Sequence, residues 1–102
     1  MNDVQLNLNE KGHGAFFIMS EEKSLGEMVV GVEDKRLTVY HTEVAAEMEG
    51  KGLAKKMLEA MVGYARQNGL KVIALCPYVH VQFQRHPEAY ADVWQKNEAD
   101  EA

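Results

Sequence analysis

Cys76 carries the most nucleophilic side chain in the sequence and precedes Pro77 at the end of an apolar run. Proline favours the first position of a helix, so the thiol is expected at the N-terminus of a short helix, where the thiolate form is favoured. A thiolate in that place can take an acyl group by nucleophilic attack. Cysteine is also a small apolar residue that many proteins bury without using its thiol. Both roles of Cys76 therefore stay open.

Two imidazoles and one phenol accompany Cys76 in the sequence or in the expected fold. His80 lies four positions after Cys76 on the same helical face, and it is expected to be exposed. His41 lies in a β-rich segment across the expected cleft, as either a catalytic base or a hydrogen-bonded structural residue. Tyr78 would place its hydroxyl either as a proton donor or at the edge of the core. The predicted catalytic residues are Cys76, His41 and Tyr78.

A zinc site is the other chemistry that cysteine and histidine could perform here. Zinc requires three or four convergent ligands, and the candidates are Cys76, His80 and His86. His86 directly precedes Pro87, which breaks the helix, so its imidazole shares no face with the other two. The sequence therefore predicts no metal.

A glycine-containing turn lies where the β-rich half of the chain changes to a helical pattern. Gly50 and Gly52 lack the Cβ atoms that would keep an anion away from the backbone, and Lys51 and Lys55 add positive charge. Backbone N–H groups at a helix N-terminus bind phosphate, although the same pattern also fits a plain loop with solvated lysines. The turn lacks both the nucleotide-triphosphate ending and the dinucleotide fingerprint. The predicted anion-binding residues are Glu49, Gly50, Lys51, Gly52, Leu53, Ala54 and Lys55.

The chain before this turn alternates apolar and polar residues with the period of half-buried strands. A glycine-flanked turn at residues 12–14 separates the first two strands, and short polar breaks separate the others. Because the connections are short, the four strands are expected to form an antiparallel meander. The predicted strands cover residues 4–8, 15–19, 27–32 and 36–44.

The chain after the turn has the period of a helix. Apolar residues recur every three or four positions from 52 to 68, and Gly69 is placed as a C-terminal cap. The run 70–75 is mostly apolar, as in a strand buried on both faces, and would close a right-handed parallel crossover. Two short helices follow over 78–85 and 87–94, where Tyr90, Val93 and Trp94 are expected to join the core. The predicted fold class is α/β in the α+β sense: a four-strand meander, a βαβ crossover to a fifth strand and short C-terminal helices.

Length and composition limit the possible functions. A chain of 102 residues and 11.5 kDa corresponds to one domain over 1–102, with a core over about 3–94 and an acidic tail over 95–102. The formal net charge of -5 argues against nucleic-acid binding and favours cationic partners. One cysteine forms no internal disulfide, and neither a signal segment nor a long apolar span opens the chain. A soluble, cytoplasmic monomer or weak homodimer without membrane contact is expected.

Several of these motifs together resemble a small, single-domain group within the GNAT acetyltransferases. Gly52 and Ala54 match the last two fixed positions of the GNAT pyrophosphate turn, Gln/Arg-x-x-Gly-x-Gly/Ala, while Glu49 stands where Gln or Arg is usual. The likeness covers about residues 3 to 94. Its most specific segments are His41-Thr42-Glu43-Val44, Tyr64-Ala65, Cys76-Pro77-Tyr78-Val79 and His86-Pro87.

This resemblance implies a minimal GNAT fold that binds CoA or acetyl-CoA between splayed fourth and fifth strands. It implies that backbone groups near Glu43 and Val44 hold the pantetheine arm, that Cys76 lies beside the thioester, and that Tyr78 protonates the departing thiolate. The implied activity is acetyl transfer to a small-molecule amine or to a lysine-containing protein, by direct attack or through acetyl-Cys76. The alternative is a non-catalytic CoA-binding, acyl-CoA-binding or protein-interaction module with the same fold.

Overall fold

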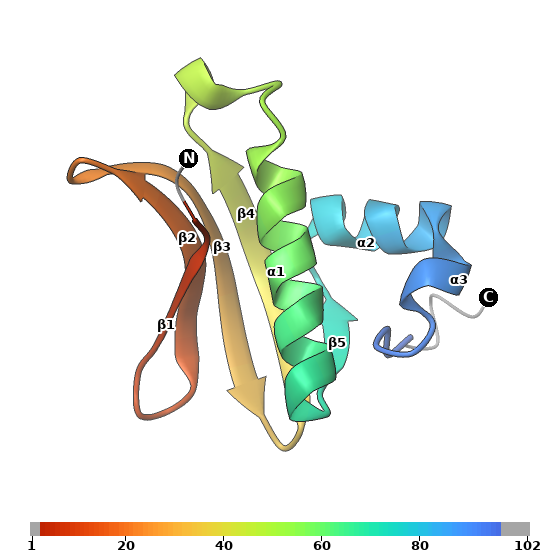
Figure 1. Cartoon of the computed structure of the whole chain (residues 1–102). Helices are drawn as coiled ribbons and strands as arrows, with labels where there is room; N and C mark the ends of the chain where they lie inside the picture. The colour runs from red at the N-terminus through yellow and green to blue at the C-terminus, as the bar shows by residue number, and fades with distance from the viewer. Residues whose placement is uncertain (1–2, 97–102) are drawn as a thin grey trace.

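The computed structural model describes residues 3–96, so residues 1–2 and most of the predicted acidic tail lie outside it. Five strands form one sheet in chain order, with β1 to β4 antiparallel and β5 parallel to β4 (Figure 1). This arrangement confirms the predicted meander and crossover. Within the described part of the chain, no helix is long and apolar enough to span a membrane. The elements are β1 (Gln5–Leu8), β2 (His13–Ser20), β3 (Lys23–Glu33), β4 (Arg36–Val44), η1 (Ala46–Met48), α1 (Leu53–Asn68), β5 (Lys71–Ala74), α2 (Pro77–Arg85) and α3 (Pro87–Tyr90).

The two hairpins on either side of β3 have turns of only two residues. Glu21 and Glu22 connect β2 to β3, and Asp34 and Lys35 connect β3 to β4, all four with positive φ between 50° and 65°. Such left-handed pairs match the twist of antiparallel strands, and polar side chains tolerate them better than β-branched ones. Because the turns are so short, β3 is longer than the predicted strand over 27–32.

The turn predicted at residues 12–14 was placed too late, because His13 and Gly14 belong to β2. Gly14 pairs with Leu8 on β1, and a Cβ at this position would lie 1.8 Å from the carbonyl oxygen of Asn7. The glycine therefore permits a close approach of two strands instead of forming the turn. Gly12, with φ of 84°, supplies the left-handed residue of the turn itself.

The core lies between one face of the sheet and α1. Figure 1 shows α1 running along β4 on this face, with α2 beyond β5. Side chains of alternate strand residues point into the core, and α1 presents its apolar stripe to them. We call the opposite face of the sheet the bare face, since no helix among residues 3–96 covers it. The fully buried side chains of this core include Ile18, Met28, Val30, Leu37 and Val39 of the sheet and Met57 and Met61 of α1.

The prediction of a fifth strand buried on both faces is wrong. Val72 is fully buried, whereas Lys71 is exposed and Leu75, just after β5, is 55% exposed. The helices cover only one face of β5, so only alternate residues of this run are buried. The second predicted helix is also too long, because α3 ends at Tyr90 and the following chain lies beside β5, where Val72 donates its N–H to the carbonyl of Val93 at 2.7 Å.

Aromatic contacts attach α2 to the rest of the molecule. The Phe83 side chain is completely buried, and its ring lies 4.7 Å from that of Tyr90 and 5.6 Å from that of Trp94, between centroids. Val93 is buried next to them. The core role predicted for Tyr90, Val93 and Trp94 is therefore correct, although these residues do not share one helix.

Replacing Phe83 with alanine should destabilise the domain by about 3–5 kcal/mol, because it removes a fully buried aromatic ring and leaves a cavity. Urea unfolding followed by circular dichroism measures this change. Val81 lies on the same helix and is 38% exposed, so Val81→Ala should cost less than about 1 kcal/mol. Equal losses in the two variants would show that α2 does not depend on Phe83.

Candidate functional site

One extra residue in β4 opens the sheet between β4 and β5. Val30 of β3 pairs with Val39, but the preceding Val29 pairs with His41, so Tyr40 is left without a partner in a β-bulge. The parallel ladder to β5 ends at the same level, with Val39 opposite Ala74. β4 continues to Val44 with no strand on that side. A bulge bends and twists its strand, which accounts for the separation of the two strands.

The open edge of β4 presents backbone groups that no strand satisfies. The N–H of Ala45 donates to the carbonyl of Leu25 on β3. Backbone polar groups of a strand alternate between its two edges, so those of Glu43 also point toward β3. Those of Thr42 and Val44 point to the open edge. Of the two residues predicted to hold a ligand through the backbone, Val44 therefore lies at this edge and Glu43 does not.

A cavity of about 270 Å³ lies between this open edge and the N-terminus of α1. It brings together most of the residues predicted from the glycine turn, whereas Lys51 and Glu43 are not in its wall. Lys23 of β3 forms an ion pair with Glu47 of η1, and this hydrogen bond lowers the pKa of the Glu47 carboxyl. The pair attaches the loop before the turn to the sheet. The cavity is lined by Val44, Met48, Glu49, Gly50, Gly52, Leu53, Ala54, Lys55 and Tyr78.

The glycine turn leaves the start of α1 available to an anion. Gly50 and Gly52 have φ of 80° and 79°, and a Cβ at either position would meet no atom within 4 Å. Gly52 is the N-cap of α1, in which no side chain caps the N-terminus and no acidic residue lies in the first turn. Unsatisfied N–H groups and the helix dipole attract negative charge. The side chain of Lys55 adds a positive charge to the same cavity.

Tyr78 lies opposite the glycine turn in this cavity. Its side chain is partly buried, and this burial raises the pKa of the phenol, with smaller contributions from Tyr90, Cys76 and Glu59. The hydroxyl therefore stays protonated through neutral pH and can act as a proton donor. Tyr78 reaches this place because Cys76 is the N-cap of α2 and Pro77 is its first residue, as the sequence predicts.

Cys76 is 2% exposed and belongs to the hydrophobic core. Its Sγ lies 3.2 Å from Oγ1 of Thr42 on β4, and either atom can be the donor of this hydrogen bond. The contact connects the two sides of the opening just beyond the bulge. The sequence predicts no chemical role for Thr42, which enters there only within the segment His41-Thr42-Glu43-Val44 of the family resemblance, because a threonine in a β-rich segment carries no chemical signal of its own.

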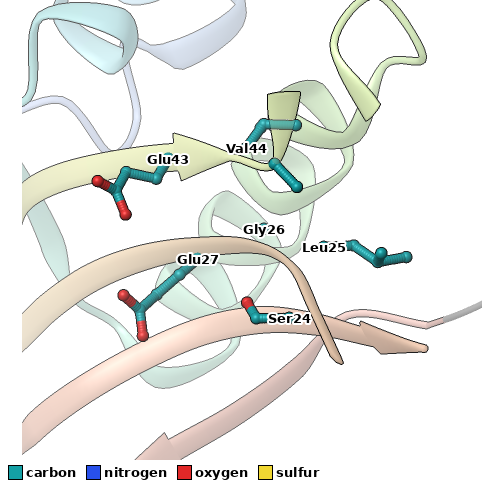
Figure 2. Close-up of a pocket in the computed structure, with 7 residues that line it drawn as sticks. Ser24, Leu25, Gly26, Glu27, Glu43 and Val44 are labelled. Atoms are coloured by element: carbon teal, nitrogen blue, oxygen red, sulfur yellow. The ribbon is translucent and has the colours of Figure 1, made fainter. Parts of the chain in front are cut away.

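His41 lies on the other side of β4 from Cys76. Neighbouring residues of a strand point to opposite faces, so Thr42 points toward α1 and His41 toward the bare face. Nε2 of His41 is 3.3 Å from Oε1 of Glu43, and both side chains are exposed. Figure 2 shows Glu43 beside Glu27 of β3, its direct cross-strand neighbour. The structure therefore groups Cys76 with Tyr78 on one face and places His41 on the other.

The imidazole of His80 packs against an aromatic side chain. The expectation that His80 is exposed is wrong, because its ring is half-buried and meets Trp94 edge to face with centroids 5.9 Å apart. Across residues 3–96, no three His, Cys, Asp or Glu side chains converge in a way that could hold a metal ion.

The site as a whole has the parts that an acyl transfer requires. A helix N-terminus for an anion, an unpaired strand edge for amide groups and a protonated phenol line one continuous region on the α1 face. An imidazole and two carboxylates lie on the bare face, near the same opening of the sheet. Two ligands, one on each face of the sheet, could meet through the gap between β4 and β5.

Comparison with known proteins agrees with this geometry. Residues 15–93 match the family model described as GCN5-related N-acetyl-transferase. A solution structure of a GCN5-like putative N-acetyltransferase from Staphylococcus aureus is 31% identical, with a TM-score of 0.68 over 96% of this chain and 94% of that one. No curated protein matches the sequence.

Two more distant structures share the fold alone. A ribosomal-protein-alanine N-acetyltransferase from Brucella melitensis biovar Abortus 2308 is 15% identical with a TM-score of 0.61, and nourseothricin acetyltransferase is 18% identical with a TM-score of 0.52. They align with 88% and 70% of this chain, which spans 66% and 56% of their lengths. The family model covers most of the sequence, and the resemblance seen in its motifs is confirmed. The chain belongs to the GCN5-related N-acetyltransferase family.

Proposed function

We propose that the protein transfers an acetyl group from acetyl-CoA to an amine. The observation that carries this proposal is the cavity in which the glycine turn, the N-terminus of α1, the open edge of β4 and the Tyr78 hydroxyl meet. These groups fit a pyrophosphate next to an amide-containing arm. When bound, acetyl-CoA supplies an activated acetyl thioester.

The residues of the α1 face bind the thioester and protonate its leaving group. N–H groups at the start of α1, together with Lys55, bind the phosphates, while the backbone of Thr42 and Val44 hydrogen-bonds the amide arm. Tyr78 donates its proton to the sulfur as the carbon–sulfur bond breaks. The raised pKa of Tyr78 supports this role, because the phenol keeps its proton at neutral pH.

The residues of the bare face accept the other proton. The attacking amine forms the new carbon–nitrogen bond and must lose one proton, which His41 takes directly or through a water molecule. Glu43, 3.3 Å from the imidazole, stabilises the resulting positive charge. In this scheme the amine attacks the thioester directly, and the passage of the acetyl group through Cys76 stays a separate prediction.

CoA should raise the melting temperature of the protein, because a ligand that binds only the folded state stabilises it. At a CoA concentration about a hundredfold above the Kd, binding adds about 2.7 kcal/mol to the free energy of unfolding. For a domain of this size, that raises the melting temperature by about 10 °C or more. Gly52→Val should lose the shift, since its side chain would occupy the free space above the turn. Differential scanning fluorimetry measures both.

Gly69→Val is the matched control, because Gly69 has φ of 65° at the other end of α1 and also has no neighbour within 4 Å of its Cβ position. Both variants carry similar left-handed strain, about 1–2 kcal/mol. For each variant, the melting temperature with CoA is compared with the melting temperature of the same variant without CoA. A full shift in Gly52→Val would remove the glycine turn from the binding site.

Tyr78→Phe should lower kcat about a hundredfold to ten-thousandfold, the usual contribution of a general acid, and should keep the CoA-induced thermal shift. In the wild-type protein, burial raises the pKa of Tyr78, so the phenol keeps its proton through neutral pH. Deprotonation of this phenol should therefore reduce the wild-type rate only above about pH 10. Release of free CoA thiol across pH measures this profile. Tyr64→Phe serves as the control, since Tyr64 packs edge-on against Phe16 away from the cavity. A decline centred near neutral pH in the wild-type profile would argue against Tyr78.

A route through Cys76 predicts one acetyl group on this residue after incubation with acetyl-CoA and no amine. Intact-mass and peptide mass spectrometry detect it, and Cys76→Ala should lose both the adduct and turnover while still binding CoA. The burial of the thiol and its contact with Thr42 favour direct transfer. In that case the parent protein carries no adduct and Cys76→Ala retains turnover.

A further inference from the structure

We propose that the bare face docks an extended polypeptide segment whose lysine side chain is the acetyl acceptor. This inference rests on the proposed function and specifies its substrate class. A small free amine would need an enclosing pocket, because ligand sites usually surround most of their ligand. The bare face instead offers an uncovered sheet surface with two adjoining hollows.

The two hollows extend across four strands. One, of about 470 Å³, lies at the ends of β3 and β4 and includes Glu27 and Glu43 in its wall (Figure 2). The other, also about 470 Å³, includes Asn7 of β1 and His13 and Phe17 of β2. Glu27 lines both, so the hollows meet there. Strands lie about 4.8 Å apart, so the distance from β1 to β4 is about 14 Å and matches an extended segment of about four or five residues.

Charge complementarity identifies the side chain that fits the first hollow. Glu27 and Glu43 are direct cross-strand neighbours and both are exposed, an arrangement that like charges make unfavourable. Among the described residues, only His41 forms an ion-pair contact with either of them. One ammonium group between the two carboxylates would offset one of their two negative charges and relieve their repulsion. It would also lie on β4 next to the open edge, where the proposed thioester ends.

Exposed apolar side chains supply the contact for the neighbouring residues of such a segment. Tyr40 is 50% exposed and Leu75 is 55% exposed. They lie on neighbouring segments, because Leu75 donates its N–H to the carbonyl of Val39, the residue before Tyr40. Gly31 has no side chain, and the rings of His13 and Tyr40 approach to 3.2 Å from where its Cβ would be. A polypeptide can contact this surface beside its lysine, which a free amine cannot do.

The first experiment measures docking without turnover. An N-acetylated, C-amidated pentapeptide with a central lysine and apolar neighbours is titrated into isotopically labelled full-length protein and followed by NMR. We expect the amide signals of Asn7, Phe17 and Glu27 to shift, and the affinity to fall as salt screens the charges. Glu27→Gln should raise the Kd about threefold to fivefold. Glu33→Gln makes the same charge change elsewhere on β3 and should leave the Kd unchanged.

The second experiment compares acceptors. With acetyl-CoA, kcat/KM for the peptide should exceed that for butylamine, which carries the same ammonium group, by about tenfold or more. Glu27→Gln should raise the KM for the peptide more than it lowers kcat. Turnover of butylamine with no detectable peptide binding would overturn the docking proposal and leave acetyl transfer intact. Peptide binding with no turnover of any amine would overturn acetyl transfer and leave the docking surface intact.

Two further results would overturn the proposal. Equal weakening of peptide binding by Glu27→Gln and Glu33→Gln would show that only overall charge matters. A concentration-dependent dimer in sedimentation that protects Phe17 and Glu27 and excludes the peptide would assign the bare face to a second copy of the chain.

Discussion

At Tyr40, β4 has one residue more than β3 opposite it, and the parallel ladder to β5 ends at the residue before. The hydrogen bonds of β4 toward β3 resume after the bulge, so the strand continues while its other edge is left without a partner. Val39 accepts hydrogen bonds from the N–H groups of both Leu75 and Cys76. Because two consecutive N–H groups donate to the same carbonyl, the chain leaves the sheet at this point and begins α2. The opening and the start of α2 therefore have a common origin.

The bulge also determines which side chains can act together. Tyr40 and His41 both point to the bare face, and the regular alternation resumes with Thr42 pointing toward α1. The open edge lies between these two sets. The glycine turn, the N-terminus of α1 and Lys55 are on the α1 face, while carboxylates and an imidazole are on the bare face. With this separation, two ligands could approach each other from opposite faces of the sheet without competing for the same side chains.

The sequence predicted β4 and α1 closely, because their patterns are local. Strand 36–44 and the apolar stripe of α1 follow from alternation and helical spacing. Separate patterns in the sequence predict the glycine turn and Tyr78 as site residues, and the two lie in one cavity. The bulge was missed, although a signal exists: the core-facing residues of β4 are Leu37 and Val39, then Thr42 and Val44, a change from odd to even positions.

Other features depended on contacts that no local pattern contains. The position of His41 relative to Cys76 follows from the bulge and could not be read from residue types. Residues 70–75 are as apolar as a strand covered on both faces, but coverage depends on where helices pack, and here they pack on one face. The cross-strand pair of Glu27 and Glu43 exists only once the register of β3 and β4 is known.

The two-residue turns at Glu21-Glu22 and Asp34-Lys35 have a consequence for the order of folding. Hairpins with such turns close small loops, so the meander from β2 to β4 has contacts of low sequence separation and can form early. The pairing of β5 with β4 spans the whole of α1 and closes a much longer loop. From loop closure alone, we therefore expect the gap between these two strands to be among the last parts of the molecule to assemble. A partly folded chain would already have its sheet and its bare face, and would gain the opening beside β4 only with the final step.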